Sequence, residues 1–293
     1  ANENNLISLT STKQLKSKCF SLDVAQYETY MEKIAMASQS TTPGSNGVAG
    51  VVESNDGSKS YLNDENGIEY TQLIEKGLMG AVFYYQATAV YLSDDRIGPN
   101  VDNTTVTPGE GTDMEHHWDE AFGYLGVPTD FPTNTSDVRF HGKYCNSRDA
   151  LLGTNSMLMD ALILGRAAIS NDDADTKNAQ VTIVRDTWEK VIAGTAVHYL
   201  NSGVSNISDD ALRNHALSEA IAFTMNLEYN PTRKITDAQI QSVLDLIGSN
   251  LYESTVTDLN DDSDIMSDIY GVESVKTHLR SHDHILQEIH LYS

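Results

Sequence analysis

Apolar residues recur at helical spacing along most of this sequence. Between Asp23 and Ala37 they return every three to four positions, which predicts a helix that packs along one face. Similar runs, separated by Gly- and Pro-rich stretches, predict several more helices. These span residues 69–92, 112–125, 148–169, 175–200, 209–227 and 236–251. Alternating strand patterns are almost absent, so we predict an all-α fold.

Three segments break the helical pattern. They are rich in Ser, Gly, Asn, Thr and Pro, a composition that favours loops, and they cover residues 38–67, 93–111 and 126–146. We therefore expect long surface loops at one end of the molecule.

Near the C-terminus, Asp258–Asp264 alternates carboxylates like the start of a calcium loop. No glycine follows in place, and Ile269 stands where a ligating glutamate belongs. We expect an acidic turn here and an amphipathic C-terminal helix after it. The polar face of that helix carries His278, His282, His284 and His290.

The order of helices suggests an internal duplication. A Glu-Lys pair followed by glycine occurs at residues 75–85 and again at residues 189–199. The predicted helix after each run carries His and Glu four residues apart. We predict two pseudo-repeated helical bundles in one compact unit, and chance similarity of helices is the alternative. The segments are 1–40, an N-terminal helix; 41–170 and 171–255, the two repeats; and 256–293, the acidic turn and C-terminal helix.

The charge of the chain limits its partners. It holds 42 acidic residues against 19 Lys and Arg, a net charge of −23. Nucleic acid and anionic membrane surfaces repel such a chain, whereas cations suit it. The most apolar stretch, residues 77–92, is too short to cross a bilayer comfortably, so we expect no transmembrane helix. The spacing of Cys19 and Cys145 leaves open whether they form a disulfide.

Candidate metal ligands gather in the first repeat. On a helix His116, His117 and Glu120 share one sector about 100° wide. Imidazole and carboxylate groups on adjacent turns can ligate a first-row metal ion. An apolar stripe that includes Trp118 lies nearly opposite, so this sector facing water is the alternative.

The second repeat carries His215 and Glu219 with apolar residues on nearly all sides. Such a helix is buried, and a buried glutamate needs a partner, a proton or a metal. His198 could approach from the neighbouring helix. The structural alternatives are a neutral His–Glu pair and a core histidine with satisfied hydrogen bonds. The metal hypothesis assigns six ligands between the helices: His116, His117, Glu120, His198, His215 and Glu219.

Several segments resemble an uncharacterised family of bacterial envelope lipoproteins that bears a domain-of-unknown-function label. The segments are Gly67–Ala81, Met114–Tyr124, Gly142–Asn146, Gly194–Asn201 and Leu212–Ala220. The resemblance covers residues 40–255. It implies a mature chain in the bacterial cell envelope, either periplasmic or as an outer-membrane lipoprotein.

The arrangement is also similar to the imelysins, iron-linked envelope proteins made of two helical bundles. Their motif is Gly-x-His-x-x-Glu. His117 and Glu120 reproduce the last part, whereas Glu115 stands at the glycine position. This resemblance implies that a bound divalent metal would be iron.

We therefore predict an envelope protein that binds a metal ion or a small ligand, with another envelope protein as a further candidate partner. One alternative is a metal-dependent peptidase or other hydrolase with Glu120 or Glu219 as general base. The sequence has no GxSxG, P-loop, GxGxxG or HExxH motif, which disfavours an enzyme. The other alternative is a non-catalytic scaffold or surface-interaction protein.

Overall fold

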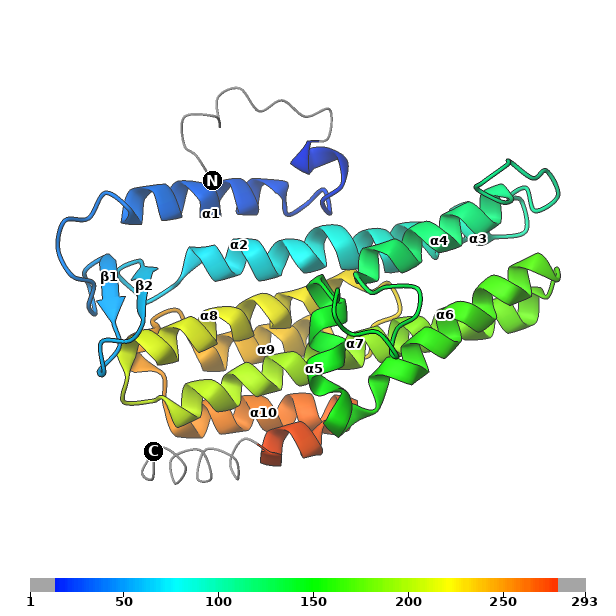
Figure 1. Ribbon diagram of the computed structural model, residues 1–293. Coiled ribbons are helices and arrows are strands. Elements are labelled where there is room, and N and C mark those ends of the chain that lie inside the picture. The colour runs from blue at the N-terminus through cyan, green and yellow to red at the C-terminus, as the bar shows by residue number, and fades with distance from the viewer. Residues whose placement is uncertain (1–13, 279–293) are drawn as a thin grey trace.

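The computed structural model describes residues 14–278, and it is mostly helical, as the sequence predicts. Long helices lie roughly side by side, with a small hairpin at one end (Figure 1). The main helices are α1 (Val24–Ala37), α2 (Tyr70–Leu78), α4 (Asp113–Leu125), α5 (Phe140–Leu152), α6 (Thr154–Ser170), α7 (Ala174–Ser205), α8 (Asp210–Asn226), α9 (Asp237–Ile247) and α10 (Val256–Tyr270). Shorter helical turns are η2 (Leu15–Ser17), α3 (Asp94–Ile97), η5 (Leu227–Tyr229) and η6 (Leu251–Glu253).

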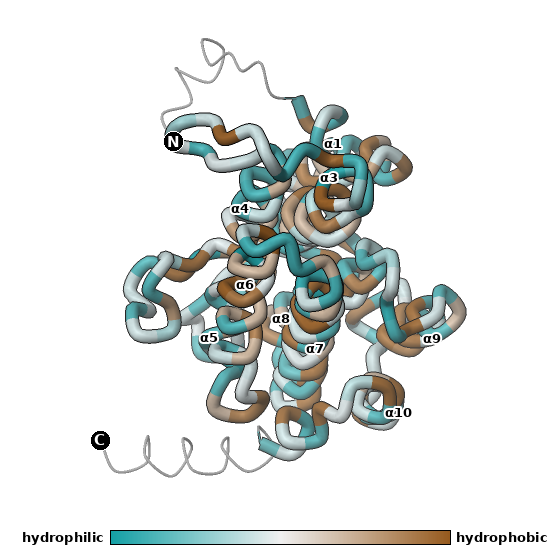
Figure 2. Tube along the Cα trace, turned by 90° about the vertical axis from the view of Figure 1, so that its right-hand side faces the viewer, coloured by the Kyte–Doolittle hydropathy of each residue, from teal (hydrophilic) through white to brown (hydrophobic). Residues whose placement is uncertain are grey.

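Helix α7 forms the centre of the fold. Helices α4, α5 and α6 lie to one side of α7 and α8, and α9 and α10 lie to the other (Figure 2). Trp188 and Ile192 of α7 are completely buried. Residues 187–200 of α7 include no exposed side chain, so apolar residues occur all round this half of the helix rather than in one stripe.

The expected loop over residues 38–67 contains a two-stranded antiparallel sheet, which the sequence did not predict. Strand β1 (Gly50–Glu53) pairs with β2 (Ser60–Asn63), so that Val52 lies opposite Tyr61. The backbone N–H of Asn55, in the connecting turn, donates to the carboxylate of Asp209 at 2.8 Å. Asp209 is the N-cap of α8, so the hairpin is fastened to the start of that helix.

The predicted helix over residues 69–92 is present, but it changes type along its length. After α2 it continues as two π-helical segments, η3 (Met79–Tyr84) and η4 (Gln86–Tyr91). The side-chain amide of Asn226 on α8 donates to the carbonyl of Lys76 at 3.0 Å. A Cβ atom at Gly80 would lie 2.0 Å from Asn226 Oδ1, so only glycine leaves room for this insertion. Side chains that enter a helix in this way widen its turns.

Two predicted helix ends have different outcomes. Helix α4 ends at Gly126 as predicted, in the left-handed conformation with a φ of 82°. The single helix predicted over residues 148–169 is two helices, because Gly153, with a φ of 63°, separates α5 from α6. Helix α5 also begins well before the predicted start, inside the segment we expected to be a loop.

The acidic turn predicted over Asp258–Asp264 is wrong, because this segment lies inside α10. The hydroxyl of Thr255 accepts a hydrogen bond from the backbone of Asp258 and caps the helix. Leu259 and Met266 are fully buried on its inner face. Asp258 in its first turn suits the positive end of the helix dipole, and the dense run of carboxylates did not prevent helix formation.

No helix within residues 14–278 is both long and apolar enough to cross a membrane. Cys19 and Cys145 are buried free thiols. The duplication of the two halves stays a prediction, as do the segment boundaries based on it. The C-terminal histidines His282, His284 and His290 lie outside the described residues.

Candidate functional site

The second predicted His–Glu pair lies on α8, but its two members have different partners. His215 Nδ1 lies 2.7 Å from Glu69 Oε2, and the imidazole stacks on the Tyr61 ring at 4.1 Å. The other carboxylate oxygen of Glu69 accepts from the amide of Gln72 at 3.1 Å. The hydrogen-bonded His–Glu pair considered from the sequence therefore has a counterpart, with Glu69 as the acid in place of Glu219.

Glu219 is buried and pairs with a lysine. Its Oε1 atom lies 3.4 Å from Lys76 Nζ, and the two side chains are only 6% and 11% exposed. Burial alone lowers the pKa of Lys76, but a hydrogen bond to Glu75 and the negative charge of Glu219 raise it above its usual value. Lys76 is therefore protonated at neutral pH and supplies the partner that a buried Glu219 requires.

Two tyrosines complete this polar cluster between α2, α5, α7 and α8. Burial, followed by the negative charge of Glu219, raises the pKa of Tyr199 well above its usual range. Burial also raises the pKa of Tyr144. Both phenols therefore stay neutral and can donate hydrogen bonds inside the cluster.

His198 does not join Glu219. Its Nδ1 atom lies 2.8 Å from a guanidinium nitrogen of Arg148. Burial, and then the charge of Arg148, lowers the pKa of His198 to about 3. The imidazole is therefore neutral and accepts a hydrogen bond from the Arg148 guanidinium, which agrees with the sequence alternative of a histidine with satisfied hydrogen bonds.

The three candidates of the first repeat lie on the outer face of α4. His116 Nε2 is 3.8 Å from Glu120 Oε1, with the side chains 44% and 41% exposed. His117 Nδ1 bonds the carbonyl of Arg96 at 2.7 Å, and the Arg96 guanidinium lies 3.5 Å from its Nε2. Trp118, on the opposite side, is buried. This arrangement matches the solvent-facing alternative for the sector.

These placements do not form a ready metal centre. No group of three or more His, Cys, Asp or Glu side chains among residues 14–278 is arranged to hold a metal ion. Cationic side chains also lie beside three of the candidates: Lys76 at Glu219, Arg148 at His198 and Arg96 at His117. A second cation at any of these positions would be repelled, so the residues present do not fit a bound metal. Metal association stays a prediction.

A groove opens beside the buried ion pair. It has a volume of about 600 Å³. Helix α2, its continuation η3 and the start of α5 form the walls. Most of its lining is apolar: Ile74, Leu78, Met79, Val82, Phe83 and Phe140. Lys76 and Tyr144 of the polar cluster also line it, together with Glu75, whose carboxylate is paired with Lys76 Nζ at 2.9 Å. A concave apolar site with a few convergent polar groups is the usual form of a small-ligand pocket.

The start of α5 makes this groove locally basic. Arg139 and Lys143 are exposed, lie one turn apart and line the groove. Neither forms an ion pair with any residue of the part described. Like charges at this spacing repel each other, and the positive end of the helix dipole adds to the repulsion. An anion in the groove would relieve both effects.

Phe140 occupies a strained backbone position at the rim. Its φ is 48°, in the left-handed region, and its side chain is 41% exposed. Its ring packs edge to face on Phe83, with centroids 4.4 Å apart. Strain of this kind persists where surrounding structure imposes it, often at binding sites. Here it holds an exposed aromatic ring over the groove.

Sequence reasoning missed this groove. It identified Glu219 as a buried acid but not its partner Lys76, which lies on a helix far away along the chain. The available signal was Arg139 with Lys143 in a chain that is otherwise strongly acidic. That pair lies in a segment we expected to be a loop, and this expectation concealed the one-turn spacing.

The fold and this site define a mostly helical protein with a ligand-sized groove beside a buried ion pair. The chain belongs to the DUF4856 family, described as a domain of unknown function, whose model matches residues 9–269. This confirms the uncharacterised family that the sequence resembles; the lipoprotein and imelysin relationships stay predictions. No curated protein and no solved structure matches the chain.

Proposed function

We propose that this chain is a small-ligand binding protein and that the groove between α2 and α5 takes an amphipathic anion. One observation carries the proposal: two unpaired cations stand at the rim of an apolar groove in a chain with a net charge of −23. An alkyl chain would cover the apolar walls, and a carboxylate would lie between Arg139 and Lys143. Such contacts combine hydrophobic burial with charge-assisted hydrogen bonds.

The sequence alternatives have less support. A hydrolase with Glu219 as general base conflicts with the lysine already paired to that carboxylate. A metal-binding function lacks a fitting set of ligands within residues 14–278. The proposal retains the expected location in the bacterial envelope, which fractionation of cells that express the protein would test.

Calorimetric titration of the full chain with decanoate tests the proposal. We expect saturable binding that weakens about tenfold in the double variant Arg139→Gln with Lys143→Gln, because each lost charge contact contributes up to about 1 kcal/mol. The matched control is Lys16→Gln with Lys59→Gln, which removes two exposed positive charges elsewhere. An equal loss of affinity in both double variants would contradict the proposal, because general charge would then explain it.

Ligand charge gives a second comparison. Decyltrimethylammonium has the same chain length and the opposite charge, so we expect it to bind more weakly than decanoate. If both bind equally, the groove recognises only the alkyl chain and the anion is the wrong ligand class.

The strained aromatic residue Phe140 gives a third test of the proposal. Phe140→Gly relieves a backbone strain of about 1–3 kcal/mol but removes the ring from the rim. We expect weaker decanoate binding with little loss in the free energy of unfolding. Unchanged affinity would show that the ring takes no part in binding.

A further inference from the structure

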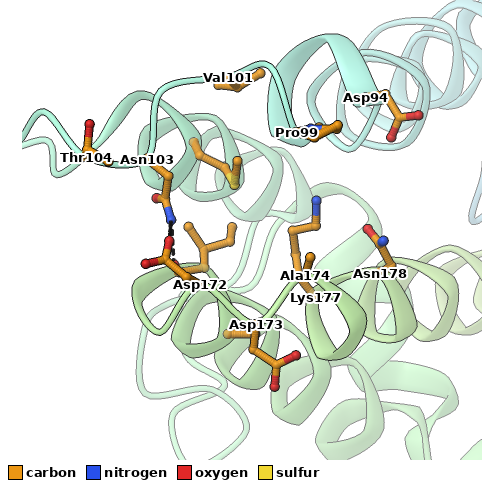
Figure 3. A pocket seen from close by; sticks show the side chains of 14 residues that line it. Asp94, Pro99, Val101, Asn103, Thr104, Asp172, Asp173, Ala174, Lys177 and Asn178 are labelled. Carbon is orange, nitrogen blue, oxygen red and sulfur yellow. Dashed lines mark hydrogen bonds between the residues drawn. The ribbon is translucent and has the colours of Figure 1, made fainter.

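A second cavity of about 490 Å³ lies where α4 and α7 begin and α6 ends. The segment after α3 covers it, and Figure 3 shows its lining. It is separate from the α2–α5 groove and shares no lining residue with it. Its volume is within the range of small-molecule sites.

A buried lysine extends into this cavity. Lys177 rises from α7 towards Pro99 and Asp94 (Figure 3), and only 5% of its surface is exposed. Its ammonium group donates to the backbone carbonyl of Ile97. Lys177 has no ion pair with a carboxylate within residues 14–278. An ammonium group has three protons to donate, so a bound acceptor could use those that remain.

Two carboxylates lie at the mouth of the same cavity. Asp94 and Asp172 are exposed and line it, whereas the Asp173 carboxylate points away from the cavity and caps α7 through Thr176. Asp172 has a φ of 55°, in the strained left-handed region, and its Oδ1 accepts from Asn103 at 2.7 Å. Asp94 lies near enough to Lys177 for its charge to raise the lysine pKa against the effect of burial, which lowers it. The two signs of charge are therefore close but not paired.

Apolar side chains line the wall of the cavity between Lys177 and the aspartates. Val101, Met114 and Ile169 line the wall beneath the covering segment. The cavity thus offers one cation inside, two anions at the mouth and an apolar surface between them.

We propose that this cavity binds a zwitterion, a free α-amino acid with an apolar side chain. Its carboxylate would accept from Lys177, its ammonium group would lie among the aspartates, and its side chain would contact the apolar wall. A simple carboxylate would meet the aspartates at the mouth without compensation. A simple amine would leave Lys177 without a carboxylate and add a second positive charge beside it.

Three probes of matched shape test this proposal by calorimetric titration of the full chain. They are leucine, 4-methylpentanoate, which lacks the amine, and 3-methylbutylamine, which lacks the carboxylate. We expect leucine to bind at least about tenfold more tightly than either analogue, since it alone satisfies both charges. Equal binding of leucine and the amine, equal binding of leucine and the acid, or no binding of any probe would overturn the proposal.

Two variants locate the binding in this cavity. In Lys177→Met we expect leucine to lose its advantage over 3-methylbutylamine, and circular dichroism would check that the variant is folded. Asp94→Asn changes an exposed residue and leaves Lys177 intact, so it keeps the test valid if the first variant unfolds. We expect it to weaken leucine binding and to strengthen 4-methylpentanoate binding. Lys143→Met, in the other groove, is the control and should leave leucine affinity unchanged; a loss there, or normal leucine binding in Lys177→Met, would refute the location.

Discussion

Asp262 on α10 should make the stability of this protein depend on pH. Its side chain is completely buried, and neither carboxyl oxygen has a hydrogen-bond partner among residues 14–278. Burial, followed by the charges of Asp258 and Asp261, raises its pKa from 3.8 to about 8. The folded state therefore keeps a proton that the unfolded chain releases above about pH 4.

The magnitude follows from this difference in pKa. At pH 7 the carboxyl is mainly protonated in the folded protein and ionised in the unfolded chain. The difference costs about 4 kcal/mol, at about 1.4 kcal/mol for each pH unit above the unfolded pKa. Replacement by asparagine removes this cost but buries an amide without partners, at a cost of about 1–3 kcal/mol. We therefore expect Asp262→Asn to stabilise the protein by about 1–3 kcal/mol at pH 7.

The sign of the effect should reverse with pH. Below pH 4 both states of the wild type are protonated, so the carboxyl imposes no penalty and the variant should be the less stable protein. As the pH rises towards 8, the wild type loses stability relative to the variant. Urea unfolding followed by circular dichroism at several pH values between 4 and 8 measures both free energies of unfolding.

The matched control is Asp268→Asn, an exposed acid on the same helix. It should show only a small difference from the wild type at every pH. A difference between wild type and Asp262→Asn that does not change with pH would refute the reasoning, because it would mean that the Asp262 carboxyl has the same pKa in both states.

Three further outcomes are expected. Elemental analysis after dialysis against iron, copper, zinc and calcium should find no retained ion, since Lys76 already pairs with Glu219; about one ion per chain, lost when Glu120 and Glu219 are both replaced by alanine, would instead support the metal hypothesis. Lys76→Met should lower the free energy of unfolding by about 3–5 kcal/mol because it leaves Glu219 buried and unpaired, and Lys76→Met with Glu219→Leu should recover most of the loss in the same urea assay. Gly80→Ala should destabilise by about 1–3 kcal/mol through the clash at its Cβ position, whereas Gly123→Ala, with open space around it, should not destabilise; equal thermal melts for the two would contradict this packing.

The sequence predicted the elements that depend on local pattern. Helices α7 and α8 follow from long apolar runs, and the end of α4 follows from Gly126, because a left-handed cap favours glycine. The β hairpin was missed because its strands are short and lie in a Gly- and Ser-rich segment. Helix α10 was missed because its carboxylates suggested a turn, although Leu259 and Met266 have helical spacing.

The site was harder to predict because it depends on pairing between distant segments. The apolar surroundings of Glu219 correctly indicated that it is buried, but the sequence could not show that its partner is a lysine on α2. The sequence likewise could not show that His215 pairs with Glu69. Helical periodicity shows which face of a helix is buried but not which side chain from another helix meets it.

The basic groove in an acidic chain has a consequence for binding kinetics. At low ionic strength a net charge of −23 repels an approaching anion over tens of ångströms, whereas Arg139 and Lys143 attract it only at close range. Added salt screens the long-range repulsion first and the short contact less. An anionic ligand should therefore associate faster as salt is added and also dissociate faster, so that its affinity changes much less than either rate.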